Sequence, residues 1–265
     1  MKKWTFIFSL IVLMSTFSCK TQYDLMLESN DIPGKYKMAF ELFEKEKYTK
    51  AASMFESMKM GVRGTSLEDT VQFYTAYSYY KWGDVYSAEQ GFSSFVESFP
   101  ISPFTQRARF LYVDCLYEQT YRYELDQTPT YKALTAIYEF IRDYPQDSSV
   151  VYCRQMSVDL EERLDRKSYE AAKLYYTIED YKAATYALKQ VLKEDADNIY
   201  REDIMYYVVL SSYKYASNSV AAKQKERYID FTDEYFTFIS EFPESKYRKE
   251  LDALSNRVNR ILNRN

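Results

Sequence analysis

Histidine is absent from this 265-residue sequence, and glycine and proline are scarce, with 5 and 6 residues respectively. The absence of histidine removes the commonest general base and the commonest metal ligand of proteins. Because glycine and proline end helices and form turns, so few of them over this length favour long helices with few loops. Aromatic residues are instead plentiful, with 29 tyrosines and 17 phenylalanines. We therefore expect an all-α protein.

Motifs of catalytic or metal-binding chemistry are also missing. The sequence contains no HExxH, P-loop, GxSxG or paired-cysteine pattern. An active site would have to use carboxylates, tyrosine, lysine or cysteine alone, and the acidic residues are expected mainly on solvated helix faces. The net charge of −4 gives no reason to expect nucleic acid or an acidic membrane surface as a partner. The sequence predicts a binding protein that is not an enzyme and uses no metal or cofactor.

The N-terminus has the organisation of an export signal. Lys2 and Lys3 precede an apolar stretch over residues 4–14, which is too short to span a bilayer comfortably. The stretch 16–19 resembles a bacterial lipobox, in which a cysteine is lipid-modified and becomes the new N-terminus. Ser18 supplies the small residue that this motif requires, although the two residues before it depart from the usual pattern.

Lipid modification is therefore predicted at Cys19, after a signal peptide over residues 1–18. Lys20 follows, where aspartate commonly retains lipoproteins in the inner membrane, and no acidic cluster comes next. We expect attachment to outer-membrane lipid on the periplasmic face, through a tether over residues 19–32. Cleavage by ordinary signal peptidase, with an incidental cysteine, is the alternative.

The stretch over residues 165–198 shows most clearly the repeat on which the chain is built. Its length of about 34 residues is that of a tetratricopeptide repeat, in which two amphipathic helices pack together. Ala172 and Ala184 supply the small residues that allow the two helices to approach, and Leu188 continues the apolar stripe. A turn over residues 178–180 separates the two helices.

More divergent copies of this pattern fill the rest of the chain. Pro100 and Pro145 end the second helix of two copies at the same distance from an alanine. The third copy contains an insertion over residues 120–130, and an uninterrupted helical segment over 148–178 precedes the fourth turn. A final amphipathic segment over 246–263 has the pattern of a capping helix. The sequence predicts a right-handed tetratricopeptide solenoid of about five helix-pair repeats with a C-terminal capping helix.

Two further cysteines, Cys115 and Cys153, fall within helical patterns. An oxidising compartment would allow them to form a disulfide. Free cysteine is, however, commonly a small buried apolar residue. The sequence leaves both states open.

Three segments resemble the BamD family of outer-membrane assembly lipoproteins. They read AYSYYKWGDVYSAEQGFSSFVESFP, YELDQTPTYKALTAIYEFIRDYP and ERLDRKSYEAAKLYYTIEDYKAATYALKQVL. The insertion with Leu125 and Gln127 and the long connector after it are the more specific marks, because plain tetratricopeptides lack them. The similarity extends over about residues 35–249. Asp195 and Ala196 depart from the family, in which a proline is typical at the end of this repeat.

The resemblance implies a scaffold without covalent chemistry, on the inner leaflet of the outer membrane. In the family, the N-terminal repeats are thought to receive unfolded outer-membrane proteins. The C-terminal repeats hold the periplasmic domains of a barrel-forming assembly protein of the Omp85 type, similar to BamA. The corresponding halves of this chain are residues 33–147 and 148–265.

Candidate contact residues follow from the helical period. Stacked helix pairs form a superhelix whose inner face is lined by the first helix of each repeat. A tyrosine-rich groove could accept an extended strand by stacking and by hydroxyl hydrogen bonds. Each of these residues could equally be inter-repeat core. The predicted groove residues are Tyr36, Phe40, Phe43, Phe73, Tyr77, Tyr80, Arg109 and Tyr112.

For the assembly partner, the long connector and the fourth repeat are the expected contact region. The alternative is that their charged residues are solvated and form weak pairs along the helix. The candidate residues are Arg154, Glu161, Arg163 and Arg166.

Two other functions would fit the same fold. A periplasmic repeat lipoprotein that coordinates envelope or cell-division proteins would keep the compartment and change the partner, although the insertion and the connector argue against it. A glycan-binding surface lipoprotein would need long insertions outside the repeats to build a sugar site. The longest insertion in this chain is the short segment 120–130.

Overall fold

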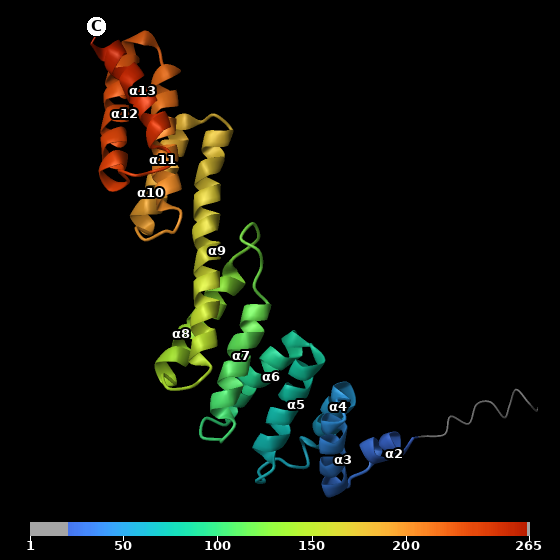
Figure 1. Ribbon diagram of the computed structural model, residues 1–265. Coiled ribbons are helices and arrows are strands. Elements are labelled where there is room, and N and C mark those ends of the chain that lie inside the picture. The colour runs from blue at the N-terminus through green and yellow to red at the C-terminus, as the bar shows by residue number, and fades with distance from the viewer. Residues whose placement is uncertain (1–20, 264–265) are drawn as a thin grey trace, which may run out of the picture. The chain divides into compact units, whose positions relative to one another are not determined.

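The computed structural model describes residues 21–263, and within this range the chain forms helices and no strands (Figure 1). The predicted signal peptide and Cys19 lie outside the described residues. The helices are α2 (Gln22–Glu28), α3 (Ile32–Glu44), α4 (Tyr48–Met58), α5 (Glu68–Trp82), α6 (Val85–Ser98), α7 (Thr105–Glu118), α8 (Thr128–Asp143), α9 (Val150–Thr177), α10 (Tyr181–Glu194), α11 (Arg201–Ser217), α12 (Ala221–Glu241) and α13 (Arg248–Leu262).

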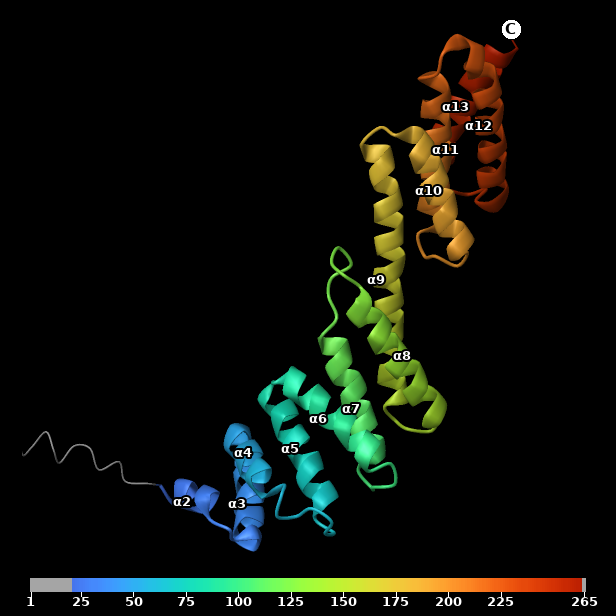
Figure 2. The ribbon, with the colours of Figure 1, turned by 180° about the vertical axis from the view of Figure 1, so that it is seen from behind.

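From α3 onward the helices follow one another as five pairs and a final helix. Each helix from α3 to α6 packs on the helix that follows it in sequence. The same holds for each helix from α10 to α12, and α13 also contacts α11. Figure 2 shows α11, α12 and α13 lying side by side. The predicted all-α tetratricopeptide fold, with helix pairs and a capping helix, is confirmed.

The chain divides into two compact units. Residues 21–120 together with 135–153 form the first unit, and residues 121–134 together with 154–263 form the second. The insertion thus belongs to the second unit, although it precedes most of the long helix α9 in sequence. The two units are described separately below.

The core of the first unit shows why small residues recur at fixed positions. Ala39, Ala51, Ala76 and Ala88 are all buried where successive helices cross. Gly91 brings α6 closest to α5, because a Cβ atom added there would lie only 2.7 Å from the Cβ of Ala76. Phenylalanine side chains fill the space beside these crossings, which is the arrangement expected for ridge-into-groove packing of helices.

In the second unit, the alanines predicted from the repeat pattern occupy the predicted places. Ala172 and Ala184 are buried with Leu188 in one cluster formed by α9, α10 and α11. A second cluster joins α11, α12 and α13, where Leu251 and Val258 of α13 are fully buried. The final helix therefore covers the last repeat with an apolar face and leaves a polar face to solvent, as a cap does.

The segment expected to act as a tether, residues 19–32, contains a short helix. Residues 22–28 form α2, whose N-terminus is closed by a capping box between Thr21 and Asp24. The Tyr23 ring lies against the ammonium group of Lys50 at 5.0 Å, and Met26 and Leu27 pack against the first core. Sequence reasoning missed this helix because it is too short for a periodic pattern to be visible.

Candidate functional site

Six of the eight predicted groove residues form one continuous cluster, which we call the α3–α5 aromatic face. They are Tyr36, Phe40 and Phe43 on α3 and Phe73, Tyr77 and Tyr80 on α5. The ring centroids of Phe43 and Tyr77 are 5.4 Å apart, and those of Tyr77 and Tyr80 are 6.1 Å apart in a stacked geometry. Five of the six are half-buried. Phe73 is only 1% exposed, so it belongs to the inter-repeat core and supports the face from behind.

Polar partners fix the hydroxyl ends of this face. Arg107 donates from Nη2 to the hydroxyl of Tyr77 at 2.8 Å, and its guanidinium lies 4.7 Å from the centre of the same ring. The hydroxyl of Tyr80 donates to Asp114 at 2.6 Å. Burial, followed by this hydrogen bond, raises the pKa of Tyr80 well above its usual range. Both rings are therefore held in place before any partner arrives, which lowers the entropic cost of binding.

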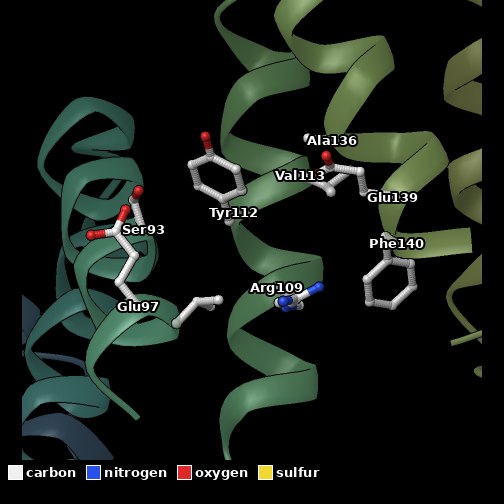
Figure 3. Close-up of a pocket in the computed structure, with 9 residues that line it drawn as sticks. Ser93, Glu97, Arg109, Tyr112, Val113, Ala136, Glu139 and Phe140 are labelled. Carbon is white, nitrogen blue, oxygen red and sulfur yellow. The ribbon is translucent and has the colours of Figure 1, made fainter. Parts of the chain in front are cut away.

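Arg109 and Tyr112, the other two predicted groove residues, line a cavity of about 210 Å³ between α6, α7 and α8. Figure 3 shows them on the central ribbon, with Ser93 and Glu97 on one side and Glu139 and Phe140 on the other. We call this space the α6–α8 cavity. The predicted groove residues thus belong to two separate features of the first unit.

The guanidinium of Arg109 is held at the edge of the α6–α8 cavity. Its Nη1 atom donates to Asp143 at 2.6 Å, and the ring of Tyr144 lies 5.8 Å away. Hydrogen bonds from Arg142 and Arg109 lower the pKa of Asp143. The Nε atom of Arg109 is buried without a hydrogen-bond partner within the described part of the protein. The arginine is thus placed by one carboxylate and keeps unused donor capacity.

In the second unit, the predicted contact residues Arg163 and Arg166 hold the insertion. Arg163 donates to the backbone oxygen of Tyr121 at 3.4 Å, and Arg166 lies over the ring of Tyr123 at 4.3 Å. Lys167, which sequence reasoning did not select, donates to the backbone oxygens of Tyr123 and Leu125 at 3.1 and 2.8 Å. These basic residues of α9 therefore make contacts within the chain, to the insertion.

The buried side chain of Gln127 holds the insertion together by hydrogen bonds. Its side chain is 4% exposed, and its Nε2 atom donates to the backbone oxygens of Arg122 and Leu125 at 2.9 and 3.0 Å. Its Oε1 atom accepts a hydrogen bond from Thr130 at 2.8 Å. One amide thus satisfies three loop and helix groups at once and fixes the conformation of the insertion. Leu125 remains about half exposed on this fixed loop.

The other two predicted contact residues lie elsewhere. Arg154 is exposed on α9. Glu161 lines an acidic cavity of about 380 Å³ together with Asp165 and Asp195. Burial and the neighbouring Asp195 raise the pKa of Asp165, while a 2.9 Å hydrogen bond from the backbone N–H of Ile199 acts in the opposite direction.

A second aromatic surface was not predicted. It consists of tyrosines on or beside the first helices of repeats four and five and the capping helix, and we call it the α9–α13 tyrosine face. Tyr206 stacks on Tyr247 with ring centroids 3.8 Å apart, and Tyr176 contacts Tyr207 at 5.0 Å. Its partly exposed members are Tyr176, Tyr200, Tyr206, Tyr207 and Tyr247, and Tyr169, which is only 6% exposed, supports them from the core. The high tyrosine count was the available signal, but it is spread over the whole chain.

Charged groups border this tyrosine face. The ammonium group of Lys173 lies 5.0 Å from the ring of Tyr169 and 5.3 Å from that of Tyr207. The hydroxyl of Tyr206 donates to Glu250 at 3.0 Å, and Tyr247 donates to Asp203. The surface is thus aromatic and partly exposed, and both positively and negatively charged side chains lie at its border. Such a surface suits recognition of a folded or extended polypeptide.

Both remaining cysteines are buried free thiols of the first unit. Burial raises the pKa of Cys115 to about 12 and that of Cys153 to about 11, so both are protonated at neutral pH. Among residues 21–263, no cluster of three or more cysteine, aspartate or glutamate side chains is arranged to hold a metal ion. None of the helices in this range is both long and apolar enough to cross a membrane.

Comparison with known proteins gives a family match and likenesses to solved structures. The family model of the YfiO outer membrane lipoproteins matches residues 30–227. Among solved structures, the chain is similar to a thermophilic tetratricopeptide-repeat protein of Thermus thermophilus, with 14% identity and a TM-score of 0.34 over 85% of this chain and 97% of that one. No curated protein matches the sequence.

Proposed function

Because the chain belongs to the YfiO outer membrane lipoprotein family, we propose that it is a lipid-anchored scaffold for the assembly of β-barrel proteins in the outer membrane. It faces the periplasm, binds unfolded barrel proteins and an assembly partner of the Omp85 type similar to BamA, and catalyses no covalent reaction. The family match over most of the chain carries this proposal. The repeat fold and the two aromatic faces support it.

The α3–α5 aromatic face is the proposed binding surface for unfolded barrel proteins. Transmembrane barrel strands alternate apolar and polar side chains and carry aromatic residues near their ends. The half-buried rings of Phe43, Tyr77 and Tyr80 offer contact area at low entropic cost, because they are already packed against one another. Arg107 adds a cation beside the hydroxyl of Tyr77. The face can therefore contact both the side chains and the polar backbone of an extended segment.

The second unit is the proposed contact for the assembly partner. The α9–α13 tyrosine face supplies aromatic area with charged edges, and exposed Arg154 on α9 supplies a cation outside the intramolecular contacts of the insertion. Arg163 and Arg166 would act here indirectly, by holding the insertion and its exposed Leu125 in place. Lipid on Cys19, which lies outside the described residues, would keep the scaffold at the membrane.

Affinity purification of the tagged protein from detergent-solubilised outer membrane tests the proposal. We expect stoichiometric recovery of a large β-barrel protein with periplasmic repeat domains. Recovery of peptidoglycan-linked or cell-division proteins without such a barrel would overturn the function and favour the envelope-coordinating alternative. Arg154→Glu should reduce recovery of the barrel protein, whereas Arg142→Glu, a charge reversal at another exposed arginine in the first unit, should not.

The substrate surface is tested by the double substitution Phe40→Ala with Tyr77→Ala. We expect a loss of affinity of about tenfold or more for peptides from the last strand of a barrel protein, since two large contact residues disappear. Phe236→Ala removes an exposed ring on α12 and is the matched control. Tyr77→Phe, which keeps the ring, provides a milder variant if the double variant does not fold. Unchanged affinity in a folded double variant would contradict the assignment.

A further inference from the structure

A cavity of about 350 Å³ lies between α4, α5 and α6 in the first unit, away from the α3–α5 aromatic face. We call it the α4–α6 cavity. Its volume falls in the range of small-ligand sites, about 300–1,000 Å³, whereas the α6–α8 cavity at about 210 Å³ falls below it. The lining residues that carry the argument are Glu56, Lys59, Gln72, Tyr79, Tyr86 and Ser94.

The repeat itself explains where this cavity comes from. Ala39 and Ala76 occupy equivalent positions in successive repeats. The same number of residues separates Gln72 of the α4–α6 cavity from Arg109 of the α6–α8 cavity, so these two residues are also equivalent. The two cavities are therefore the same inter-repeat space in successive repeats. They differ in what fills that space.

Smaller side chains make the first of the two cavities larger. Thr75 and Ala76 occupy the places of Tyr112 and Val113 on the first helix. On the second helix, Gly91 and Ser94 occupy the places of Ala136 and Glu139, by the shift that carries Ala88 onto Ala133. At these four positions the α4–α6 cavity thus has smaller side chains, two of which carry a hydroxyl group.

Aromatic rings stand along one side of the cavity. Tyr86 lines it with 67% of its surface exposed, and Tyr79 lines it from α5. Trp82, 53% exposed, contacts Tyr79 with ring centroids 6.5 Å apart. An exposed aromatic ring at the edge of a polar cavity is a platform for the C–H face of a ligand.

The rest of the lining consists of polar groups with matched charges. Burial and a hydrogen bond to Glu56 raise the pKa of Tyr79 to about 12, so its hydroxyl remains a donor. Glu56 is 4.0 Å from the ammonium group of Lys59, so the two charges compensate each other. Gln72 and Gln90 each give one amide hydrogen to a neighbouring glutamate, at 3.3 and 2.7 Å. An amide has a second hydrogen and an oxygen, so each retains capacity for a ligand.

We propose that the α4–α6 cavity binds a neutral saccharide unit. A pyranose ring has an apolar C–H face that stacks on tyrosine or tryptophan, and an edge of hydroxyls that both donate and accept hydrogen bonds. The cavity offers both kinds of partner: Tyr86 for the face, and amides, hydroxyls and a compensated ion pair for the edge. Amphipathic aromatic residues bind such mixed surfaces well.

Other ligand classes fit the cavity less well. An anion such as phosphate would meet a single lysine already paired with Glu56. An apolar peptide side chain could pack on the rings of Tyr79 and Tyr86 and on Ala76, but it would offer no hydrogen-bond partner to the amides of Gln72 and Gln90. A sugar site of this kind is built by the repeats themselves and needs no long insertion.

Trp82 allows a direct test. The sequence has two tryptophans, and Trp4 lies in the predicted signal peptide, so the mature protein purified from membranes reports on Trp82 alone. Fluorescence titrations would use chitotetraose, an N-acetylated glycan of cell-wall type, and maltotetraose, a plain hexose chain. We expect a saturable change at up to millimolar concentration with at least one of them. The preferred oligosaccharide then distinguishes a cell-wall glycan from a hexose polymer.

Two variants with matched controls locate the binding. Tyr86→Ala should weaken it about tenfold through loss of stacking, whereas Tyr186→Ala, at an exposed tyrosine on α10, should not. Ser94→Glu introduces the residue of the equivalent position in the α6–α8 cavity and should abolish binding. Ser98→Glu, an exposed change at the end of the same helix, should have no effect.

No saturable response to either sugar would overturn the proposal. Equal losses in the test variants and their controls would also overturn it, as would saturable binding of a polar peptide in the same cavity. None of these outcomes depends on recovery of a barrel protein. The saccharide proposal and the assembly function can therefore fail independently.

Discussion

At the residue scale, the abundance of tyrosine has a structural explanation as well as a proposed functional one. Tyr80 donates to Asp114 and joins the first helix of repeat two to that of repeat three, and Tyr206 donates to Glu250 and joins the first helix of repeat five to the capping helix. Within the last repeat and its cap, Tyr235 donates to Asp252 at 2.6 Å. A phenol can fill apolar space and still satisfy a carboxylate across a helix interface. Many tyrosines thus serve as inter-helix connectors.

The turn between the two helices of a repeat also depends on single residues. The same turn position follows the first helix in repeats one, two and four, where it is occupied by Glu46, Gly83 and Glu179. Their φ angles are all positive, at 57°, 89° and 65° respectively. In each turn the next residue donates to a carbonyl five positions back, as Asp84 does to Tyr79 and Asp180 to Tyr175. Glycine adopts this left-handed conformation without strain, whereas glutamate does so at a cost.

Glu179→Gly should therefore raise the free energy of unfolding by about 0.5–1 kcal/mol, because the left-handed strain of an L-residue disappears. Gly83→Ala should lower it by about 1 kcal/mol, although no atom lies within 4 Å of the added methyl group. Urea denaturation followed by circular dichroism measures both. Stabilisation by Gly83→Ala, or destabilisation by Glu179→Gly, would show that backbone strain is not the controlling factor.

At the element scale, α9 and the insertion depend on each other. α9 is the longest helix in the described range at 28 residues, and its charged stripe binds backbone oxygens of the loop that precedes α8. A loop with unpaired carbonyls needs donors, and Lys167 supplies three N–H groups from one position. Sequence periodicity reveals a charged stripe on such a helix but does not reveal what the stripe faces.

Lys167→Met should release the insertion while leaving α9 helical. We expect faster amide hydrogen exchange over residues 121–127 and a loss of about 1–2 kcal/mol in unfolding free energy, because two backbone carbonyls lose a charged donor. Lys182→Met on α10 changes an exposed lysine and is the control. Unaltered exchange in the insertion would mean that Gln127 and Arg163 hold the loop without Lys167.

Sequence reasoning located the repeat elements well because their signals are local. The connector predicted over residues 148–178 is α9, Val150–Thr177, and the cap predicted over 246–263 is α13, Arg248–Leu262. Both are long amphipathic segments in which apolar residues recur at the helical period. The short helix α2 gave no such pattern. Its capping box between Thr21 and Asp24 was present in the sequence but was not used.

The candidate site was predicted less completely, for a geometric reason. The helical period of the apolar residues places a residue on one face of its helix, but it does not show which neighbouring helix covers that face. Phe73 and Tyr77 lie one turn apart on α5, and one is buried while the other remains partly exposed. Arg109 was assigned to the same groove but lines the space between α6 and α8. Such distinctions depend on helix packing angles, which no short motif encodes.

At the scale of the whole molecule, each compact unit has an aromatic face of its own. The α3–α5 aromatic face belongs to the first unit and the α9–α13 tyrosine face to the second, so the two proposed polypeptide partners would not compete for one surface. A scaffold that recruits clients to a membrane also needs a means of staying there. The sequence predicts that role for lipid on Cys19, and this prediction can be tested separately from folding.

Cys19→Ser should move the protein from the membrane fraction to the soluble periplasmic fraction. A single acyl chain gives only marginal binding, and an outer-membrane lipoprotein is retained by several chains on one cysteine, so loss of the acceptor removes the anchor entirely. The far-UV circular dichroism and the unfolding midpoint should stay unchanged, because the described cores lie between residues 21 and 263. Ser18→Ala keeps a small residue before the cysteine and should remain membrane-bound. Retention of Cys19→Ser at the membrane in high salt, with the signal peptide cleaved, would contradict lipid anchoring and indicate attachment through a protein partner.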